Sequence, residues 1–385
     1  MKKMIALAMV AAMAVAMMAG CAGAGQQDAN TIKIGMTGPL TGGAAVYGTA
    51  VEAGMKIAVA EINAKAGENG LKIEFRSVDD EHDGEKAVNG YNSLKDWGMQ
   101  IFAGAVTTGP SLAVAAEAKN DQIFMMTPSA SAAEVAETGN NVYQMCFTDP
   151  NQGANAAQLI KDKNMGTKIG IIYDSSDEYS SGIFDGFKAK AAELGLNIVQ
   201  TSAFTDANKD NLNTQVQQCK DAGCDLVFLP FYAQEASMVL TYANTIDYNP
   251  VFFGCDGMDG ILTIEGFDAS LAEDLVLMTP FSADNQDEAT KAFVAKYKEM
   301  MKGQVPNQFA ADGYDVIYAI YNACVATGVN GGTSAEEACA KLMEYFKTAS
   351  YDGLTGANLT WNATGMVSKN PEAIVVKGGK YTPLG

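Results

Sequence analysis

The sequence predicts an α/β protein built from two doubly wound lobes, and three observations support this fold class. The chain has 385 residues, which is long for one compact core and favours two. From Thr31 onward, short apolar runs alternate with amphipathic stretches of helical length, as expected for a parallel sheet with crossover helices. After about residue 147 the alternation starts again, which indicates a second lobe of the same kind.

The first half of the alternation supplies four strands and three helices. The predicted strands are TIKIGMTG, LKIEFRSVDD, IFAGAVTT and QIFMMTP, each a short apolar or alternating run. The segments between them are predicted to be helices: YGTAVEAGMKIAVAEINAKAG, EKAVNGYNSLKDWG and SLAVAAEAKND.

The second half repeats this order. The predicted strands are KIGIIYD, LNIVQTSAF, CDLVFLPFY and PVFFGCDG, with helices such as IFDGFKAKAAELG and NLNTQVQQCKDAG between them. A proline-containing stretch, LMTPFSADN, then leads into three consecutive helices at about residues 286 to 348 and a β-rich end.

The loops that follow the strands are predicted to form a cleft. In a doubly wound sheet, the loops at the carboxyl ends of the strands face a common crevice, where ligands bind. One rim would consist of GPLTGGAAVYG, VTTGP and TPSAS, and the other of YDSSDEYSSG, PFYAQE and GCDGMDG. Two facing rims predict a ligand cleft between the lobes.

The N-terminus has the features of a bacterial lipoprotein signal. Two lysines precede an apolar stretch from Ile5 to Met18, which is shorter than the roughly 20 residues that span a bilayer. The residues Met18 to Cys21 resemble the lipobox, in which cleavage leaves a lipid-bearing cysteine. We therefore expect a signal peptide at residues 1–20, a flexible tether at residues 21–30 and an extracytoplasmic protein anchored to the cell membrane through Cys21.

The negative net charge and the single histidine argue against several classes of function. The formal net charge is −19, and a polyanion is not expected to bind nucleic acid. The one histidine, His82, lies in the acidic loop DDEHDGE, where we expect it to be solvated and a poor candidate for a general base or a metal ligand. No catalytic triad, phosphate loop or metal motif is present, so we expect no enzymatic activity, no catalytic residues, no metal and no cofactor.

Six cysteines remain besides Cys21, and an exported chain can form disulfides. Cys324 and Cys339 lie near the facing ends of two predicted helices, but the sequence does not choose among the many possible pairings. The six are Cys146, Cys219, Cys224, Cys255, Cys324 and Cys339.

The loop motifs, taken in order, resemble those of the periplasmic binding proteins for branched-chain amino acids, the leucine-isoleucine-valine binding family of ABC importers. The motifs are IGMTGPLTG, VDDEHDGEKAV, TPSAS, YDSSDEYSSG, DGYDVIYA and LTGANLTW. The resemblance covers nearly all of the mature chain and implies two lobes joined by three hinge crossings, near Phe147, Thr279 and Trp361. Lobe 1 would comprise residues 31–147 and 280–360, and lobe 2 residues 148–279 and 361–385.

The resemblance also implies a set of ligand-binding residues. Thr108 and Ser131 match hydroxyl-bearing positions, Ser129 would contribute mainly its backbone, and Asp256 matches the acid that takes the ligand's ammonium group, although relatives mostly carry glutamate there. The one arginine, Arg76, lies inside a predicted strand, so a ligand carboxylate would be held by hydroxyls and backbone N–H groups. The other matching positions are Ala130, Tyr47, Tyr179, Tyr232 and Phe309.

Structural roles remain as alternatives for each of these residues. The hydroxyl residues could be helix caps, Asp256 could belong to an Asp-Gly turn, and the aromatic residues could be ordinary core. The function implied is an extracytoplasmic, monomeric solute receptor that captures an aliphatic amino acid and delivers it to an ABC permease. The alternatives are a sensing module of the same fold, or a receptor for amides, urea or aromatic acids.

Overall fold

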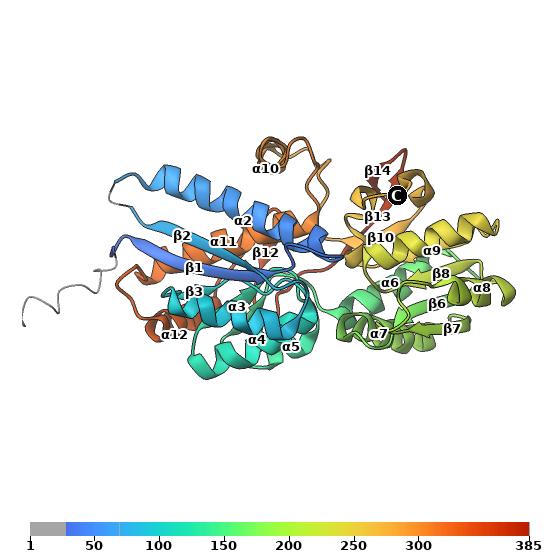
Figure 1. The fold of residues 1–385 in the computed structure, drawn as a ribbon, viewed down its shortest axis with the longest axis horizontal. Coiled ribbons are helices and arrows are strands. Elements are labelled where there is room, and N and C mark those ends of the chain that lie inside the picture. Colours follow the sequence, from blue (N-terminus) through green and yellow to red (C-terminus); the bar gives the residue numbers. More distant parts are fainter. Residues whose placement is uncertain (1–27, 69, 385) are drawn as a thin grey trace, which may run out of the picture.

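The computed structural model describes residues 28–68 and 70–384, which form two α/β lobes lying side by side (Figure 1). The first lobe contains a five-stranded parallel sheet in the order β2-β1-β3-β4-β5. Its strands are β1 (Thr31–Gly38), β2 (Lys72–Asp79), β3 (Ile101–Phe102), β4 (Phe124–Thr127) and β5 (Val142–Gln144).

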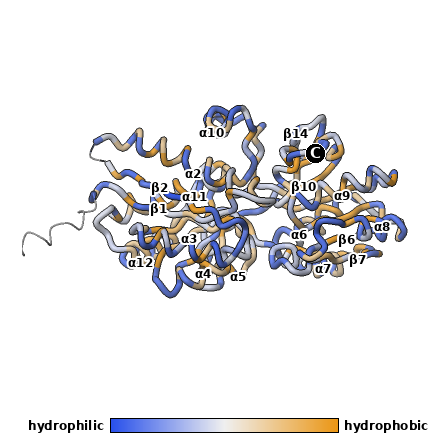
Figure 2. Tube along the Cα trace, viewed as in Figure 1, coloured by the Kyte–Doolittle hydropathy of each residue, from blue (hydrophilic) through white to orange (hydrophobic). Residues whose placement is uncertain are grey.

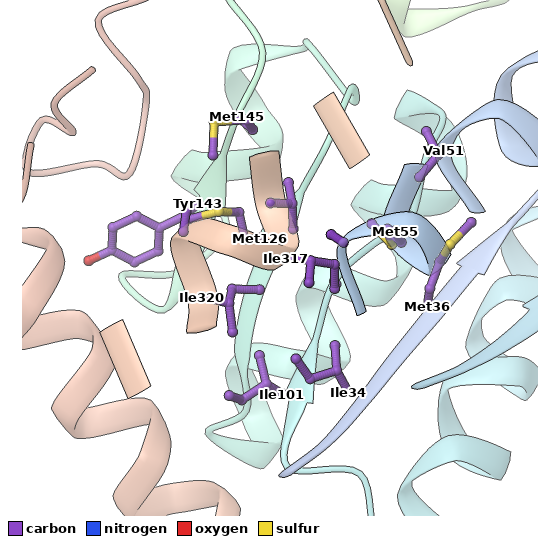
Figure 3. Close-up of a cluster of buried hydrophobic side chains, with 14 of the residues drawn as sticks. Ile34, Met36, Val51, Met55, Ile101, Met126, Tyr143, Met145, Ile317 and Ile320 are labelled. Atoms are coloured by element: carbon purple, nitrogen blue, oxygen red, sulfur yellow. The ribbon is translucent and has the colours of Figure 1, made fainter. Parts of the chain in front are cut away.

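Seven helices surround this sheet and cover both of its faces. Alternate residues of β1 point to opposite faces: Ile34 packs with the buried cluster on the side of α2 and α11, whereas Gly35 faces Leu94 of α3 (Figure 3). The helices are α2 (Ala45–Ala66), α3 (Gly84–Asp96), α4 (Thr108–Asp121), α5 (Ala133–Glu137), α10 (Glu288–Met300), α11 (Gln308–Thr327) and α12 (Ala335–Phe346).

The second lobe contains a seven-stranded sheet in the order β14-β13-β10-β9-β8-β6-β7, parallel except at β13, which pairs antiparallel with β10 and β14. Its strands are β6 (Ile169–Asp174), β7 (Ile198–Phe204), β8 (Leu226–Leu229), β9 (Val251–Gly254), β10 (Val276–Thr279), β13 (Glu372–Lys377) and β14 (Lys380–Pro383). Together the two sheets confirm the predicted fold class of two doubly wound lobes.

Helices cover both faces of the second sheet as well. One buried cluster lies under α8 and α9, and another under α6 and α7. Figure 2 shows hydrophilic residues along the outer helices and loops of both lobes, with hydrophobic stretches further inside. The helices are α6 (Asp149–Lys163), α7 (Glu178–Leu194), α8 (Asn213–Asp221) and α9 (Ala233–Thr245), with short 3₁₀ helices at Asp256–Met258, Ile261–Thr263 and Ala269–Ala272.

The chain passes between the lobes three times, and the third passage lies later than the sequence predicted. The first is between β5 and α6, the second between β10 and α10, and the third after the small hairpin β11 (Tyr351–Gly353) and β12 (Gly356–Leu359). Trp361 belongs to the core of the first lobe, where its Nε1 donates a hydrogen bond to the Gln144 carbonyl (2.9 Å). The crossing placed near Trp361 is therefore corrected to the residues just before β13, because the indole is held in the first lobe.

The expected signal peptide and Cys21 lie outside the described residues. Within residues 28–68 and 70–384, none of the helices combines the length and the hydropathy needed to cross a membrane.

Candidate ligand-binding cleft

A small cleft lies between the lobes, at the carboxyl ends of the strands of both sheets. The free space inside it is only about 10 Å³, about the room that one water molecule needs, so its own side chains nearly fill it while the lobes are in contact. Seven of the nine predicted ligand-binding residues line it, namely Tyr47, Thr108, Ser129, Tyr179, Tyr232, Asp256 and Phe309. The other residues on its wall are Val106, Thr107 and Gly257.

Asp256 is a buried acid on the second lobe's side of the cleft. Asp256 is the first residue of the 3₁₀ helix after β9, and the residue is 2% exposed. The Tyr179 hydroxyl donates to its Oδ1 at 2.6 Å and Gln152 Nε2 donates to the same oxygen at 2.9 Å. Burial raises the pKa of Asp256, and these donors counteract that rise in part. The carboxylate is thus held in place but has no cationic partner among the described residues.

The first lobe presents hydroxyl groups and a helix N-terminus to the same cleft. Thr108 is the first residue of α4, and the N-cap residue Thr107 makes no side-chain capping bond. The Thr108 hydroxyl forms no hydrogen bond within the described part of the chain. The Ser129 hydroxyl, in contrast, donates to the Val106 carbonyl at 2.7 Å, and the Ser129 N–H forms a long hydrogen bond to Thr127 Oγ1 (3.4 Å).

The structure does not place Ala130 or Ser131 on the cleft wall. Ala130 packs in the core of the first lobe, its N–H donates to Thr127 Oγ1 (3.0 Å), and its carbonyl accepts from Gln144 Nε2 (2.8 Å). Both backbone groups of Ala130 are thus paired within the first lobe, and a ligand contact at this residue stays a prediction.

Ser131 lies deeper, beside Asp149. No hydrogen bond of good geometry pairs its buried hydroxyl or either carboxylate oxygen of Asp149. Burial raises the pKa of Asp149 well above its ordinary value, and the neighbouring Ser131 hydroxyl opposes that rise. The Ser131 hydroxyl therefore lies against Asp149, and Ser131 is not part of the cleft wall.

The aromatic residues join the two lobes across the cleft. The Tyr47 hydroxyl, from the first lobe, donates to the Gly257 carbonyl (2.6 Å) and accepts from the Ala233 N–H (2.9 Å), both in the second lobe. The Tyr47 ring lies 4.8 Å from that of Phe309 and 5.3 Å from that of Tyr232. The two lobes are therefore in direct contact across the cleft.

A third hydrogen bond between the lobes involves an acidic residue that the sequence did not single out. Asp259 of the second lobe accepts from the backbone N–H of Gln308, the first residue of α11 (2.8 Å). Burial raises the pKa of Asp259 to about 7. Its other oxygen, Oδ1, is buried and unpaired.

Two polar residues at the cleft were not predicted. Gln152 fixes Asp256, yet nothing in the sequence distinguishes it from any other glutamine in the first turns of a helix. His82 was expected to be solvated, and that expectation is wrong: its Nδ1 lies 2.8 Å from Thr107 Oγ1, and its ring centroid lies 5.6 Å from that of Tyr232. Burial lowers the pKa of His82.

Neither the cysteines nor the acidic residues provide a reactive centre. The six cysteines within the described ranges are free and buried. Cys255 Sγ lies 2.9 Å from the Tyr179 hydroxyl, and burial raises the pKa of its thiol, which disfavours the nucleophilic thiolate. Among the described residues, no group of three or more His, Cys, Asp or Glu side chains is arranged to hold a metal ion.

Comparison with known proteins assigns the family. A sequence model described as periplasmic binding protein matches residues 31–380. The chain belongs to the periplasmic binding protein family. This assignment agrees with the resemblance seen in the ordered loop motifs and makes the protein a solute-binding protein and not an enzyme.

Individual members of the family are similar over most of their length. The Leucine-, isoleucine-, valine-, threonine-, and alanine-binding protein of Pseudomonas aeruginosa is 27% identical over 88% of this chain and 87% of its own. The isoleucine complex of the branched-chain amino acid transporter substrate binding protein LivJ from Streptococcus pneumoniae has a TM-score of 0.82 at 25% identity, covering 91% of this chain and 97% of that one. A solute binding protein from R. palustris in complex with benzoate shares the fold, with a TM-score of 0.80 at 20% identity over 92% of this chain and 96% of that one.

Proposed function

We propose that this protein, outside the cytoplasm, captures an aliphatic, branched-chain amino acid in its interlobe cleft and delivers it to an ABC permease in the membrane. The observation that carries the proposal is the polarity of the cleft. A buried carboxylate, Asp256, lies on one lobe, and the free hydroxyl of Thr108 with the N-terminus of α4 lies on the other. A zwitterion matches both, because its ammonium pairs with Asp256 and its carboxylate accepts from hydroxyl and N–H donors.

Charge favours an amino acid over an aromatic acid. No lysine or arginine is among the residues that line the cleft, and Arg76 instead packs over the ring of Trp97, 4.3 Å from its centroid. A simple carboxylate such as benzoate would add a second negative charge near Asp256 without any cation to balance it. An α-amino acid brings its own ammonium group. The names of the P. aeruginosa and S. pneumoniae relatives, which refer to aliphatic amino acids, support the same ligand class.

Calorimetry on an Asp256→Ala variant tests the ligand's ammonium partner. Losing one member of a buried charge pair costs about 2 to 5 kcal/mol, so leucine or valine should bind roughly 30-fold to a few thousand-fold more weakly. The deaminated analogue 4-methylpentanoate should bind the wild-type protein poorly for the same reason. A folded Asp256→Ala variant that stays within threefold of wild type for every amino acid would contradict the assignment.

A thermal-shift screen identifies the ligand class directly. A solute present at 100 times its dissociation constant raises the free energy of unfolding by about 2.7 kcal/mol. We expect leucine, isoleucine or valine to give the largest rise, and benzoate, urea and simple amides to give none. A response to benzoate alone would replace the amino-acid proposal with an aromatic-acid receptor.

We further propose that Cys21 carries the lipid that anchors the protein, because a short apolar run and small residues precede it in the sequence. A Cys21→Ala variant should lose membrane association and keep its signal peptide. A variant that fractionates with the membrane and is processed like wild type would exclude lipidation at Cys21.

A further inference from the structure

The only histidine of the chain lies in a loop with an unusual backbone. Glu81 and His82 are consecutive non-glycine residues with positive φ, 50° and 63°, a region such residues rarely adopt. Asp80 holds the turn, because its side chain accepts from the His82 N–H (3.0 Å) and its carbonyl accepts from the Asp83 N–H (2.8 Å). The loop thus fixes the direction of the imidazole.

The imidazole engages the residue that would otherwise cap α4. His82 Nδ1 lies 2.8 Å from Thr107 Oγ1. A threonine at an N-cap normally accepts a hydrogen bond from the second or third N–H of its helix, yet the Thr107 side chain makes no such bond. The N–H groups of Thr108 and Gly109 therefore keep their hydrogen-bonding capacity for an anion, whereas the third residue of α4, Pro110, has no N–H.

The same imidazole also contacts the second lobe. It meets the Tyr232 ring edge-on, with centroids 5.6 Å apart and planes at 84°. Asp206 and Lys209, from the loop between β7 and α8, face it from that lobe, and Asp83 faces it from its own loop. These contacts join the two lobes and depend on a closed cleft.

We propose that His82 is a positioning residue of the ligand cleft, which holds the Thr107 hydroxyl away from the N-terminus of α4 and closes the cleft mouth against Tyr232. This inference rests on the proposed function, because it assigns the α4 N-terminus to a ligand carboxylate. It adds a residue that acts through Thr107 and Tyr232 without touching the solute.

The proposal predicts the sign of a pH effect. Burial, followed by Lys209, lowers the pKa of His82 in the closed form, against the influence of Asp206 and Asp83. Closure therefore favours the neutral imidazole, and solute affinity should fall as the pH drops below about 6.5, the ordinary histidine value. Burial raises the pKa of Asp80, which accepts the His82 N–H, to about 6 and the pKa of Asp177 and Asp259 to about 7. These carboxyls act in the opposite direction, so the His82 contribution is measured as a difference from a variant that does not titrate at position 82.

Two variants separate the effect of the hydrogen bond to Thr107 from the effect of protonating the imidazole. Asparagine and glycine both accept positive φ, so neither should add backbone strain at position 82. The His82→Asn amide can replace Nδ1 as the partner of Thr107 but does not titrate, whereas His82→Gly removes both properties. Leucine binding is measured by calorimetry at pH 7.5 and 5.5, on proteins without a polyhistidine tag and with thermal unfolding as the folding control.

At pH 7.5 we expect His82→Asn to bind leucine within threefold of wild type. We expect His82→Gly to bind about tenfold more weakly, the effect of one lost hydrogen bond at a partly buried site. Between pH 7.5 and 5.5, the wild-type affinity should fall by up to about tenfold relative to that of His82→Asn. Variants with the wild-type affinity and the wild-type pH profile would show that His82 is a bystander, and the inference would be wrong while the proposed function stood.

Proton NMR provides a readout that does not depend on leucine. Because the chain has one histidine, a single imidazole Cε1–H resonance reports its titration. We expect a midpoint below 6.5 in the free protein and a further decrease when leucine is added. A titration midpoint at the ordinary histidine value, both in the free protein and with leucine added, would overturn the inference. If leucine does not bind at all, the proposed function is refuted, and the midpoint in the free protein alone then decides the role of His82.

Discussion

Replacing Tyr47 with phenylalanine should weaken solute binding while leaving each lobe folded. The hydroxyl is the only part removed, and it joins the first lobe to the Gly257 carbonyl and the Ala233 N–H of the second. When the cleft is open, water can hydrate these backbone groups, so the substitution does not destabilise the open form. When it closes they are buried without a partner, which costs about 1–3 kcal/mol for each group. A combined cost of about 2–6 kcal/mol corresponds to roughly a 30- to 20,000-fold loss of affinity.

Calorimetry measures this loss, and small-angle scattering shows whether the liganded variant still becomes as compact as wild type. Tyr248→Phe is the matched control, because the Tyr248 hydroxyl donates to the Cys224 carbonyl (3.0 Å) within the second lobe. The control should lower stability and leave affinity unchanged. Tyr47→Phe binding leucine within twofold of wild type would refute the view that this hydroxyl stabilises closure.

Three further perturbations test the surroundings of the cleft. Lys369→Met should lower the free energy of unfolding in urea by about 3–5 kcal/mol, because it leaves the buried partner Asp312 unpaired, and adding Asp312→Leu should recover much of the loss. The pKa of Asp259 is raised to about 7 by burial, so the folded chain binds more protons than the unfolded chain, and stability should fall as the pH rises from 5 to 8. Asp259→Asn should flatten that slope in urea titrations. Gln152→Leu should weaken leucine binding about tenfold in calorimetry, because Asp256 loses a 2.9 Å hydrogen bond.

The fold could be predicted from the sequence because its signal is local and repeated. Ile32, Ile34 and Met36 alternate along β1 and all belong to the buried cluster beneath α2 and α11, as the pattern of apolar residues requires. The error at the third crossing has a different origin. Trp361 lies in the first lobe because its indole N–H reaches the Gln144 carbonyl, a contact between residues far apart in sequence that no local pattern reveals.

The sequence predicted the position of some cleft residues but not of others. Asp256 and Tyr179 lie where strand ends approach the cleft, and the order of the loop motifs placed them there. Ala130 follows Ser129 directly, but a single step along the chain turns its side chain into the core. His82 looked solvated because its neighbours in sequence are acidic, whereas its neighbours in space are Thr107 and Tyr232.

The contacts between the lobes explain why closure can respond to a solute. Tyr47, Asp259 and His82 each contribute one or two hydrogen bonds or ring contacts across the cleft, and none of them depends on a bound solute. A typical hydrogen bond contributes about 1 kcal/mol net, so these contacts favour closure only modestly. A solute shifts the equilibrium by the difference between its affinities for the closed and open forms, and a solute that pairs with Asp256 while contacting Thr108 would supply such a difference, because these residues line the cleft from opposite lobes. Strengthening the contacts between the lobes should therefore raise affinity for all solutes alike, whereas changing Asp256 should alter which solutes are bound.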